Sequence, residues 1–412
     1  MPGGAGGAGP LRQNCRPCPM PPAPSRPDSL TRPLGAGVVT ALVGFTSSFA
    51  VVLTGLQAVG ASPSQAASGL SALCLTQGLG ILWLARRFRT PITLAWSTPG
   101  AALLAGTGVV AGGWPAAVGA FVVVGAAIVL TGLWPRLGAL IAAIPASLAQ
   151  AMLAGILVPL CLAPVEGVMD APAAILPVVA TWLVLQRLRP RWAVPGAFGA
   201  AAVVVAIHLV RSGTAPAARE LVPALELTAP AWTWQALLGI ALPLYIVTMA
   251  SQNIPGTAVL DSFGYATPWR AAMTVTGLGT VAGATAGGHA INLAAISAAL
   301  AAAPEAEPDP ARRWVVAWCA GWSYLALAVC STGLATVVAT APDGVVEAVA
   351  GLALLATLGG ALASALRDAP EREAAVVTFL VAASGWSMFG IGSAFWALMV
   401  GLAVRVGLSS GR

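Results

Sequence analysis

Long apolar stretches follow one another along this chain, and they leave its backbone few choices of structure. A helix needs roughly 20 apolar residues to cross a bilayer core, and twelve stretches of about that length are present. Only 8% of the 412 residues are charged, whereas a soluble domain has about 25%. The chain is therefore predicted to be an all-α polytopic membrane protein. The twelve predicted spans are residues 34–60, 66–85, 114–133, 138–163, 171–187, 192–210, 235–260, 270–286, 313–341, 344–366, 373–388 and 390–407.

Two more apolar segments, roughly residues 92–109 and 289–303, are interrupted by glycine, proline and small polar residues. The first contains Ser97-Thr98-Pro99-Gly100, and the second follows Gly287-Gly288-His289. At membrane depth, unpaired backbone groups are tolerated only inside protein or beside a cavity. Each segment is therefore predicted to form an extended lead-in followed by a half-helix, which brings the count to fourteen transmembrane elements. The alternative is that Pro and Gly only kink two ordinary helices.

The placement of the arginines tests this count. All twenty basic residues are arginine. If the N-terminus is cytoplasmic and fourteen elements cross the membrane, only Arg211 and Arg219 lie outside, as the positive-inside rule requires. Both termini are then cytoplasmic, and the inner cell membrane is the predicted location. Because the net charge of +6 comes from arginines near helix ends, we expect no nucleic-acid partner.

Fourteen elements divide into two halves of seven, and an odd number per half inverts one half relative to the other. Each broken segment is third in its half, an arrangement common in secondary transporters. The polar loop 211–234 is the predicted join. The two half-helix N-termini would face each other near the midplane and offer N–H groups and partial positive charge to an anion. In the first, Ser97 is the predicted cap and Pro99 lies in the first turn.

A third polar cluster interrupts the span 235–260. Gln252 and Asn253 are costly in hydrocarbon, so they are predicted to face either the substrate or a partner helix. Pro255 removes a backbone hydrogen bond and leaves the carbonyl near Ser251 without its helical donor. The counterpart polar residues of the first half are Ser47, Ser48, Thr54 and Gln57.

Two residues are candidates for proton coupling. His289 is the only side chain in a broken segment that titrates near neutral pH. Asp261 follows the inner end of the span 235–260. Each has a plainer alternative, which is a buried structural histidine for the first and a solvated loop carboxylate for the second.

Nothing in the sequence indicates catalysis. No nucleophile–base pair, metal-ligand cluster or phosphate-binding loop is present, so we expect no enzyme, no cofactor and no metal site. Cys15-x-x-Cys18 is half of a metal motif without a second pair. It lies in residues 1–33, a Gly/Pro-rich stretch that is predicted to be a disordered cytoplasmic tail.

Four motifs occur in a defined order along the chain: WSTPGAALL at 96–104, TMASQNIPG at 248–256, GGHAINLAAI at 287–296 and PEAEPDPARR at 304–313. Together they resemble the benzoate:proton symporter (BenE) family over residues 34–407. The resemblance implies import of benzoate or a related aromatic carboxylate with protons, through a nucleobase/sulfate-transporter-like fold of seven plus seven elements. The alternatives are the same fold carrying a nucleobase or other small anion, and a passive anion channel.

The resemblance also implies two domains, with the core moving against the gate in an elevator-like step. The core would comprise residues 34–135 and 235–341, and the gate residues 136–210 and 342–407. A homodimer is a further expectation. Trp96 and Ile291, with apolar gate residues, are predicted to form a slot for the aromatic ring. The predicted substrate-binding residues are Ser97, Thr98, Gly100, Gln252, Asn253, His289, Ala290, Ile291 and Asn292.

Overall fold

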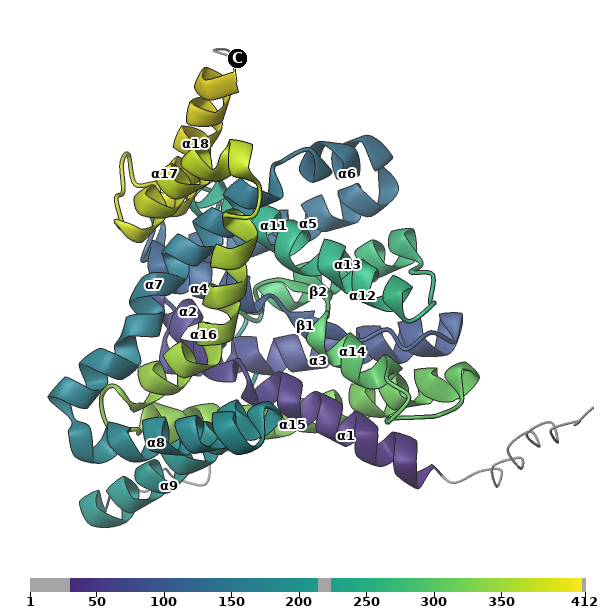
Figure 1. Ribbon diagram of the computed structural model, residues 1–412. Helices are drawn as coiled ribbons and strands as arrows, with labels where there is room; N and C mark the ends of the chain where they lie inside the picture. Colours follow the sequence, from purple (N-terminus) through teal and green to yellow (C-terminus); the bar gives the residue numbers. More distant parts are fainter. Residues whose placement is uncertain (1–29, 214–223, 410–412) are drawn as a thin grey trace, which may run out of the picture.

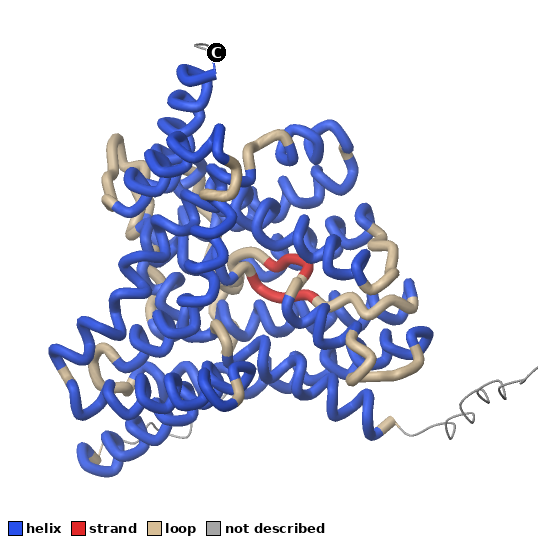
Figure 2. The backbone as a smooth tube through the Cα atoms, viewed as in Figure 1, coloured by secondary structure: helices blue, strands red, loops and turns tan. Residues whose placement is uncertain are grey.

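The computed structural model describes residues 30–213 and 224–409, and over these ranges the protein is a bundle of helices with one small sheet (Figure 1). The sheet consists of two short strands, β1 (Leu94–Trp96) and β2 (Ile291–Leu293), in the middle of the bundle (Figure 2). The Cys15–Cys18 pair, most of the predicted tail and residues 214–223 of the inter-repeat loop lie outside the described residues. Helix α1 begins at Thr31, so the last residues of the predicted disordered tail are helical instead.

The helices follow the predicted apolar spans closely. In the first half they are α1 (Thr31–Thr46), α2 (Phe49–Ala58), α3 (Pro63–Phe88), α4 (Thr98–Thr107), α5 (Gly113–Leu133), α6 (Pro135–Ala142), α7 (Ala146–Asp170), α8 (Pro172–Leu188) and α9 (Ala193–Ser212). In the second half they are α10 (Trp234–Ala236), α11 (Leu242–Thr248), α12 (Ile254–Ser262), α13 (Trp269–Ala284), α14 (Ile296–Ala302), α15 (Arg313–Ala339), α16 (Val345–Ala365), α17 (Arg372–Ala383) and α18 (Ser393–Ser409). Two π-helical turns, η3 (Leu237–Ala241) and η4 (Met249–Asn253), join α10, α11 and α12 into one continuous helix. Three single 3₁₀ turns, η1 (Pro190–Trp192), η5 (Pro310–Arg312) and η6 (Ala369–Glu371), precede α9, α15 and α17.

Eight helices among the described residues are long and apolar enough to cross a membrane. Two more apolar helices, Pro172–Leu188 and Ser393–Leu408, are shorter. Length and composition therefore confirm the prediction of a mostly helical, polytopic membrane protein.

Two predicted spans differ from the structure at a single break each. The span 34–60 is divided into α1 and α2, because the backbone leaves the helical conformation at Ser48, where φ is −154°. The span 138–163 is divided near Pro145, which is extended (ψ 124°) and precedes the first residue of α7. In both places a serine or a proline interrupts the helix, although hydropathy alone predicts one continuous span.

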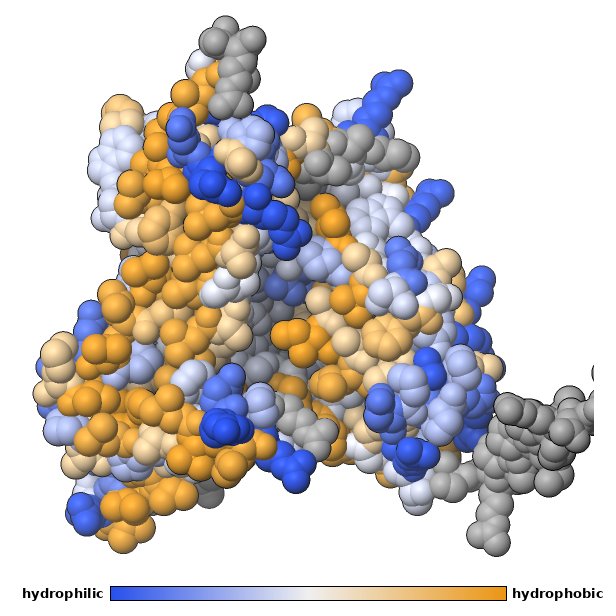
Figure 3. Space-filling model, viewed as in Figure 1, coloured by the Kyte–Doolittle hydropathy of each residue, from blue (hydrophilic) through white to orange (hydrophobic). Residues whose placement is uncertain are grey.

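The helices pack in two groups, and α2 contacts both of them. One group contains α1, α3, α5, α13, α14 and α15, and the other contains α7, α8, α9, α16, α17 and α18. Helix α2 packs on α3 and α4 and also on α16. Figure 3 shows the surface hollowed between a strongly apolar lobe and the rest of the molecule.

Glycine pairs set the closest helix contacts in the first group. A Cβ atom built on Gly277 of α13 would lie 2.6 Å from the carbonyl oxygen of Gly125 in α5. A Cβ atom on Gly321 of α15 would lie 3.1 Å from the carbonyl oxygen of Gly78 in α3. Small residues at these crossings let the backbones touch, as is typical of helices that associate in a bilayer. The two crossings hold the helices that flank the central sheet.

Candidate functional site

The two broken segments meet at the centre of the protein and pair with each other. Strands β1 and β2 are antiparallel, with Ala95 opposite Asn292 at the middle position. The pairing continues on both sides, since Ser97 N donates to Ala290 O (2.8 Å) and Ala294 N donates to Thr93 O (3.1 Å). Each extended segment therefore supplies the backbone partners that the other lacks at membrane depth.

The first half-helix, α4, begins as predicted. Ser97 is its N-cap, and the Ser97 hydroxyl accepts a hydrogen bond from Gly100 N at 3.2 Å. The same hydroxyl accepts a hydrogen bond from Thr248 Oγ1 at 2.9 Å, which ties this helix start to α11. The first three residues of this helix are Thr98, Pro99 and Gly100. Pro99 has no N–H and Gly100 N is already paired, so among the described residues only Thr98 N is left without an acceptor.

The second half-helix, α14, begins without a cap. Its N-cap position is Ala295, which makes no side-chain hydrogen bond. No acceptor among the described residues pairs with the N–H groups of residues 296–298, and Ala299 N is the first to bond backward, to Ala295 O. Ile296 is 77% exposed, so the start of this helix is open. Three backbone donors are thus available here, against one in α4.

Both helix starts line a cavity of about 150 Å³. Thr98 and Pro99 come from α4, and Ala295, Ile296 and Ser297 come from the start of α14. No charged side chain contributes to the lining. The remaining lining residues are Val43, Gly44, Ser47, Ser48, Ala95, Trp96, Gln252, Ala294, Leu300, Tyr324, Ala353 and Thr357.

An aromatic wall stands on one side of this cavity. Trp96 Nε1 donates to Ser48 Oγ at 2.8 Å, which fixes the indole ring at the break between α1 and α2. Phe45 and Tyr324 both pack edge-on against Trp96, with ring centroids 5.7 Å and 6.5 Å away. Aromatic faces and edges of this kind suit a flat apolar ligand.

Of the nine predicted binding residues, Thr98 and Gln252 line the cavity. Ser97 and Gly100 form the capped start of α4 behind it. Asn253 is fully buried, and its Oδ1 accepts a hydrogen bond from Leu293 N at 2.9 Å, so it holds β2 in place. A substrate contact for these buried residues stays a prediction.

The four remaining predicted residues lie in and before β2, and all are fully buried. His289 Nε2 donates to Ser97 O at 3.0 Å, while its Nδ1 has no partner among the described residues. Ala290 and Ile291 make hydrogen bonds through their backbone atoms. Ala290 O accepts from Ser97 N, and Ile291 N donates to Thr280 Oγ1 at 3.1 Å. Asn292 Nδ2 donates to Leu293 O, and its Oδ1 is buried without a partner among the described residues.

Asp261, the second proton candidate, lies apart from this centre. It is exposed in the last turn of α12, where its backbone carbonyl accepts from Gly264 N. It is absent from the residues that line the central cavity. The two proton candidates are therefore in very different surroundings.

The other lining residues differ in how far the sequence pointed to them. Ser47 and Ser48 were identifiable as polar residues within an apolar span, and both line the cavity. Tyr324 and Thr357 carried no distinct signal. They come from α15 and α16, whose sequences are apolar on all sides. In such helices no periodic pattern tells which residue faces a cavity.

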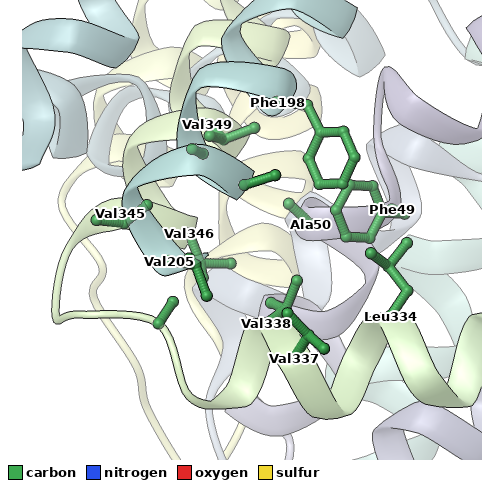
Figure 4. A pocket seen from close by; sticks show the side chains of 13 residues that line it. Phe49, Ala50, Phe198, Val205, Leu334, Val337, Val338, Val345, Val346 and Val349 are labelled. Atoms are coloured by element: carbon green, nitrogen blue, oxygen red, sulfur yellow. The ribbon is translucent and has the colours of Figure 1, made fainter. Parts of the chain in front are cut away.

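A second cavity differs sharply in chemistry. It measures about 40 Å³ and lies between α2, α9, α15 and α16. Figure 4 shows its lining as hydrocarbon, with Phe49 and Phe198 on one side and valines on the other. Because it offers no hydrogen-bond donor, it cannot hold a carboxylate.

Comparison with known proteins now decides the family. Residues 28–406 match the family model BenE, described as benzoate membrane transport protein. The chain belongs to the BenE family. This BenE protein is 39% identical over 372 residues to inner membrane protein YdcO of Escherichia coli (strain K12), covering 89% of this chain and 93% of that protein. It is 28% identical, also over 372 residues, to the benzoate membrane transport protein of Acinetobacter baylyi (strain ATCC 33305 / BD413 / ADP1), covering 89% of this chain and 92% of that one.

Solved structures show the fold. The transmembrane domain of the cyanobacterial bicarbonate transporter BicA superimposes with a TM-score of 0.59 at 14% identity, covering 90% of this chain and 97% of that one. Murine Solute Carrier 26 family member A9, an anion transporter in the inward-facing state, superimposes with a TM-score of 0.63 at 13% identity, covering 93% of this chain and 68% of that one. The family match and the fold together make the BenE protein a membrane transporter.

Proposed function

We propose that this BenE protein imports benzoate or a related aromatic carboxylate together with protons. The observation that carries the proposal is the uncharged cavity at the starts of α4 and α14, which places open backbone donors opposite an aromatic wall. An aromatic carboxylate needs both features, since its anionic group requires hydrogen-bond donors and its ring requires a flat apolar surface.

In the proposed binding mode the carboxylate points at the first turn of α14. The N–H groups of residues 296–298 and the hydroxyl of Thr98 donate to its oxygens, and the Gln252 amide adds a further donor. The ring packs along Trp96 and Tyr324. Because no arginine clamps the anion, binding is weak enough to be reversible, as transport requires.

Proton coupling is assigned to His289 in this proposal. Its Nε2–H is held by Ser97 O, so the neutral ring presents an unprotonated Nδ1 that has no partner among the described residues. A proton arriving there would place a positive charge directly behind the start of α4. Asp261, which is exposed and outside the cavity, is the second candidate.

The full architecture of fourteen elements in a seven-plus-seven inverted repeat is also proposed. It is supported by contacts that recur between the halves: α3 packs on α15 as α13 packs on α5, and α7 packs on α17 as α16 packs on α8. The broken segments are third in each half under this division.

The domain division and the elevator-like step form part of the same proposal. Core residues 34–135 and 235–341 supply most of the cavity lining, while gate residues 136–210 and 342–407 supply Ala353 and Thr357. The substrate would therefore lie between the two domains. Cytoplasmic termini and a homodimer remain predictions.

Transport in proteoliposomes tests this function. Radiolabelled benzoate should accumulate above its external concentration when an inward proton gradient is imposed, and the accumulation should collapse with a protonophore. Equilibration without accumulation would favour a passive channel. Competition by a nucleobase or bicarbonate stronger than that by benzoate analogues would favour the same fold with a different cargo.

A further inference from the structure

A groove separates the C-terminal end of α3 from the start of α13, and none of its lining residues lines the central cavity. The two helices run antiparallel and touch near Gly80, where an added Cβ would lie 3.0 Å from Val275 Cγ1. Beyond this contact they separate and leave a groove of about 530 Å³. Its lining residues are Trp83, Phe88, Pro268, Trp269, Arg270, Ala271, Thr274 and Val275.

The groove combines aromatic rings with positive charge. Trp83 and Phe88 pack edge-on at 5.9 Å, and the guanidinium of Arg87 lies 5.4 Å above the Phe88 ring. Arg270 contributes to the lining from the first turn of α13, which has no side-chain cap. No acidic residue lines the groove.

The charge of these arginines is not neutralised by neighbouring carboxylates. Within the described ranges the one salt bridge joins Arg405 to Glu371, in the other group of helices. Arg86, Arg87 and Arg270 are all exposed. The mouth of the groove therefore carries a positive field that favours an anion.

The groove opens onto the apolar surface of the bundle. Trp83 is 50% exposed, and Leu79, one helical turn earlier on the same face of α3, is 53% exposed. On α13, Leu278 lies one turn beyond the lining residue Thr274 and is 56% exposed. A ligand seated here would meet water and arginine at one end and hydrocarbon along its length.

We propose that this groove binds an anionic phospholipid. Its phosphate would lie against Arg270 and Arg87, its glycerol region against Trp83 and Trp269, and its acyl chains along Leu79 and Leu278. Basic pockets between transmembrane helices recognise anionic headgroups in this way, and aromatic residues sit at the same depth. The continuity of the groove with the lipid-facing surface selects a lipid over a free phosphate ion.

Native mass spectrometry of the full-length protein tests the proposal without any transport assay. The protein is exchanged into detergent containing equal amounts of dioleoylphosphatidylglycerol and dioleoylphosphatidylcholine, and the ratio of retained lipids is measured. The double variant Arg87→Gln/Arg270→Gln should lower the phosphatidylglycerol preference about fivefold for each arginine removed. The matched control Arg187→Gln/Arg189→Gln removes the same charge from the end of α8 and should leave the ratio within about twofold.

A Trp83→Ala variant and a competition with inorganic phosphate extend this experiment. Trp83→Ala should reduce retention of both lipids, because the wall shared by their glycerol and acyl regions is lost. An excess of inorganic phosphate should leave the bound phosphatidylglycerol in place. Equal ratios in the wild type and the arginine double variant, or displacement of the lipid by phosphate, would overturn the proposal whether or not the protein transports benzoate.

Discussion

The two half-helices occupy corresponding places in the chain, yet their starts differ chemically. Helix α4 has ten residues, and its N-cap is Ser97, whose hydroxyl accepts hydrogen bonds from Gly100 N and from Thr248 Oγ1. Helix α14 has seven residues, and its N-cap position is Ala295, which makes no side-chain hydrogen bond. Among the described residues, the start of α4 therefore leaves one N–H group open, whereas the start of α14 leaves three open.

The two half-helices thus have corresponding positions in the fold but different hydrogen-bonding groups at their starts. The capped helix is the anchored partner, since its N-cap residue is hydrogen-bonded to Thr248 of α11 and to His289 in the segment before β2. The uncapped helix is the one expected to meet the anion. The following predictions test this division, beginning with the largest effect.

Replacing Ala295 with Asp should abolish most uptake. The carboxylate of an aspartate at the N-cap would accept hydrogen bonds from the open N–H groups of α14. It would thereby exclude the carboxylate of the substrate. The initial rate of benzoate uptake in proteoliposomes should fall by at least about twentyfold. Ala295→Ser, which introduces a neutral cap, should cause a smaller loss. Wild-type rates in the Asp variant, at equal reconstitution, would mean that α14 does not bind the anion.

Replacing Gln252 with Ala should weaken binding about tenfold, because one hydrogen bond to a charged group is lost from the cavity. The apparent KM for benzoate should rise while thermal stability stays unchanged. The neighbouring variant Asn253→Ala serves as the contrast, since Asn253 holds Leu293 N rather than facing the cavity. It should lower the Tm in detergent. The reverse pattern would exchange the roles of the two amides.

Replacing His289 with Gln should flatten the pH dependence of uptake between about pH 5 and 8. Glutamine can still donate to Ser97 O, so the start of α4 keeps its support, but it cannot take up a proton. Wild-type uptake should rise several-fold as the external pH falls, and the variant's should change less than about twofold. Coupling that persists unchanged would direct attention to Asp261, for which Asp261→Asn is the matching test.

Replacing Ser97 with Ala should have the smallest effect on transport. Loss of the cap costs about 1–2 kcal/mol of stability, which thermal unfolding in detergent measures. Uptake at saturating benzoate should stay within about threefold of wild type, because the Ser97 hydroxyl is already committed to Gly100 and Thr248. A loss as large as that of the Ala295→Asp variant would erase the distinction between the two half-helices.

The parts of the site that were predictable from sequence are those governed by local chemistry. Ser97 as a cap and Pro99 in the first turn were predictable because capping involves residues only three positions apart. The extended lead-ins were predictable because glycine, proline and small polar residues follow one another closely in both interrupted segments. Two of the four BenE motifs, at 96–104 and 287–296, lie in these segments, and the family model confirmed the resemblance.

Other features depended on contacts between distant residues. The adjacent amides Gln252 and Asn253 of the π-helical turn η4 have different surroundings, since Gln252 lines the cavity and Asn253 accepts a hydrogen bond from Leu293 N of β2. Tyr324 and Thr357 enter the site from helices that are apolar on every face. Neither result follows from periodicity, because a helix that is apolar on every face carries no amphipathic signal.

By itself, the sequence determined that this chain spans a membrane, where the two interrupted segments lie, and how the first half-helix begins. Each of these follows from hydropathy or from hydrogen bonds between near neighbours. The tertiary structure alone decided that the two breaks pair as strands nearly 200 residues apart in the chain, with Trp96 opposite Ile291. It also decided that α14 keeps open donors beside an aromatic wall, because those neighbours come from separate helices and only packing brings them together.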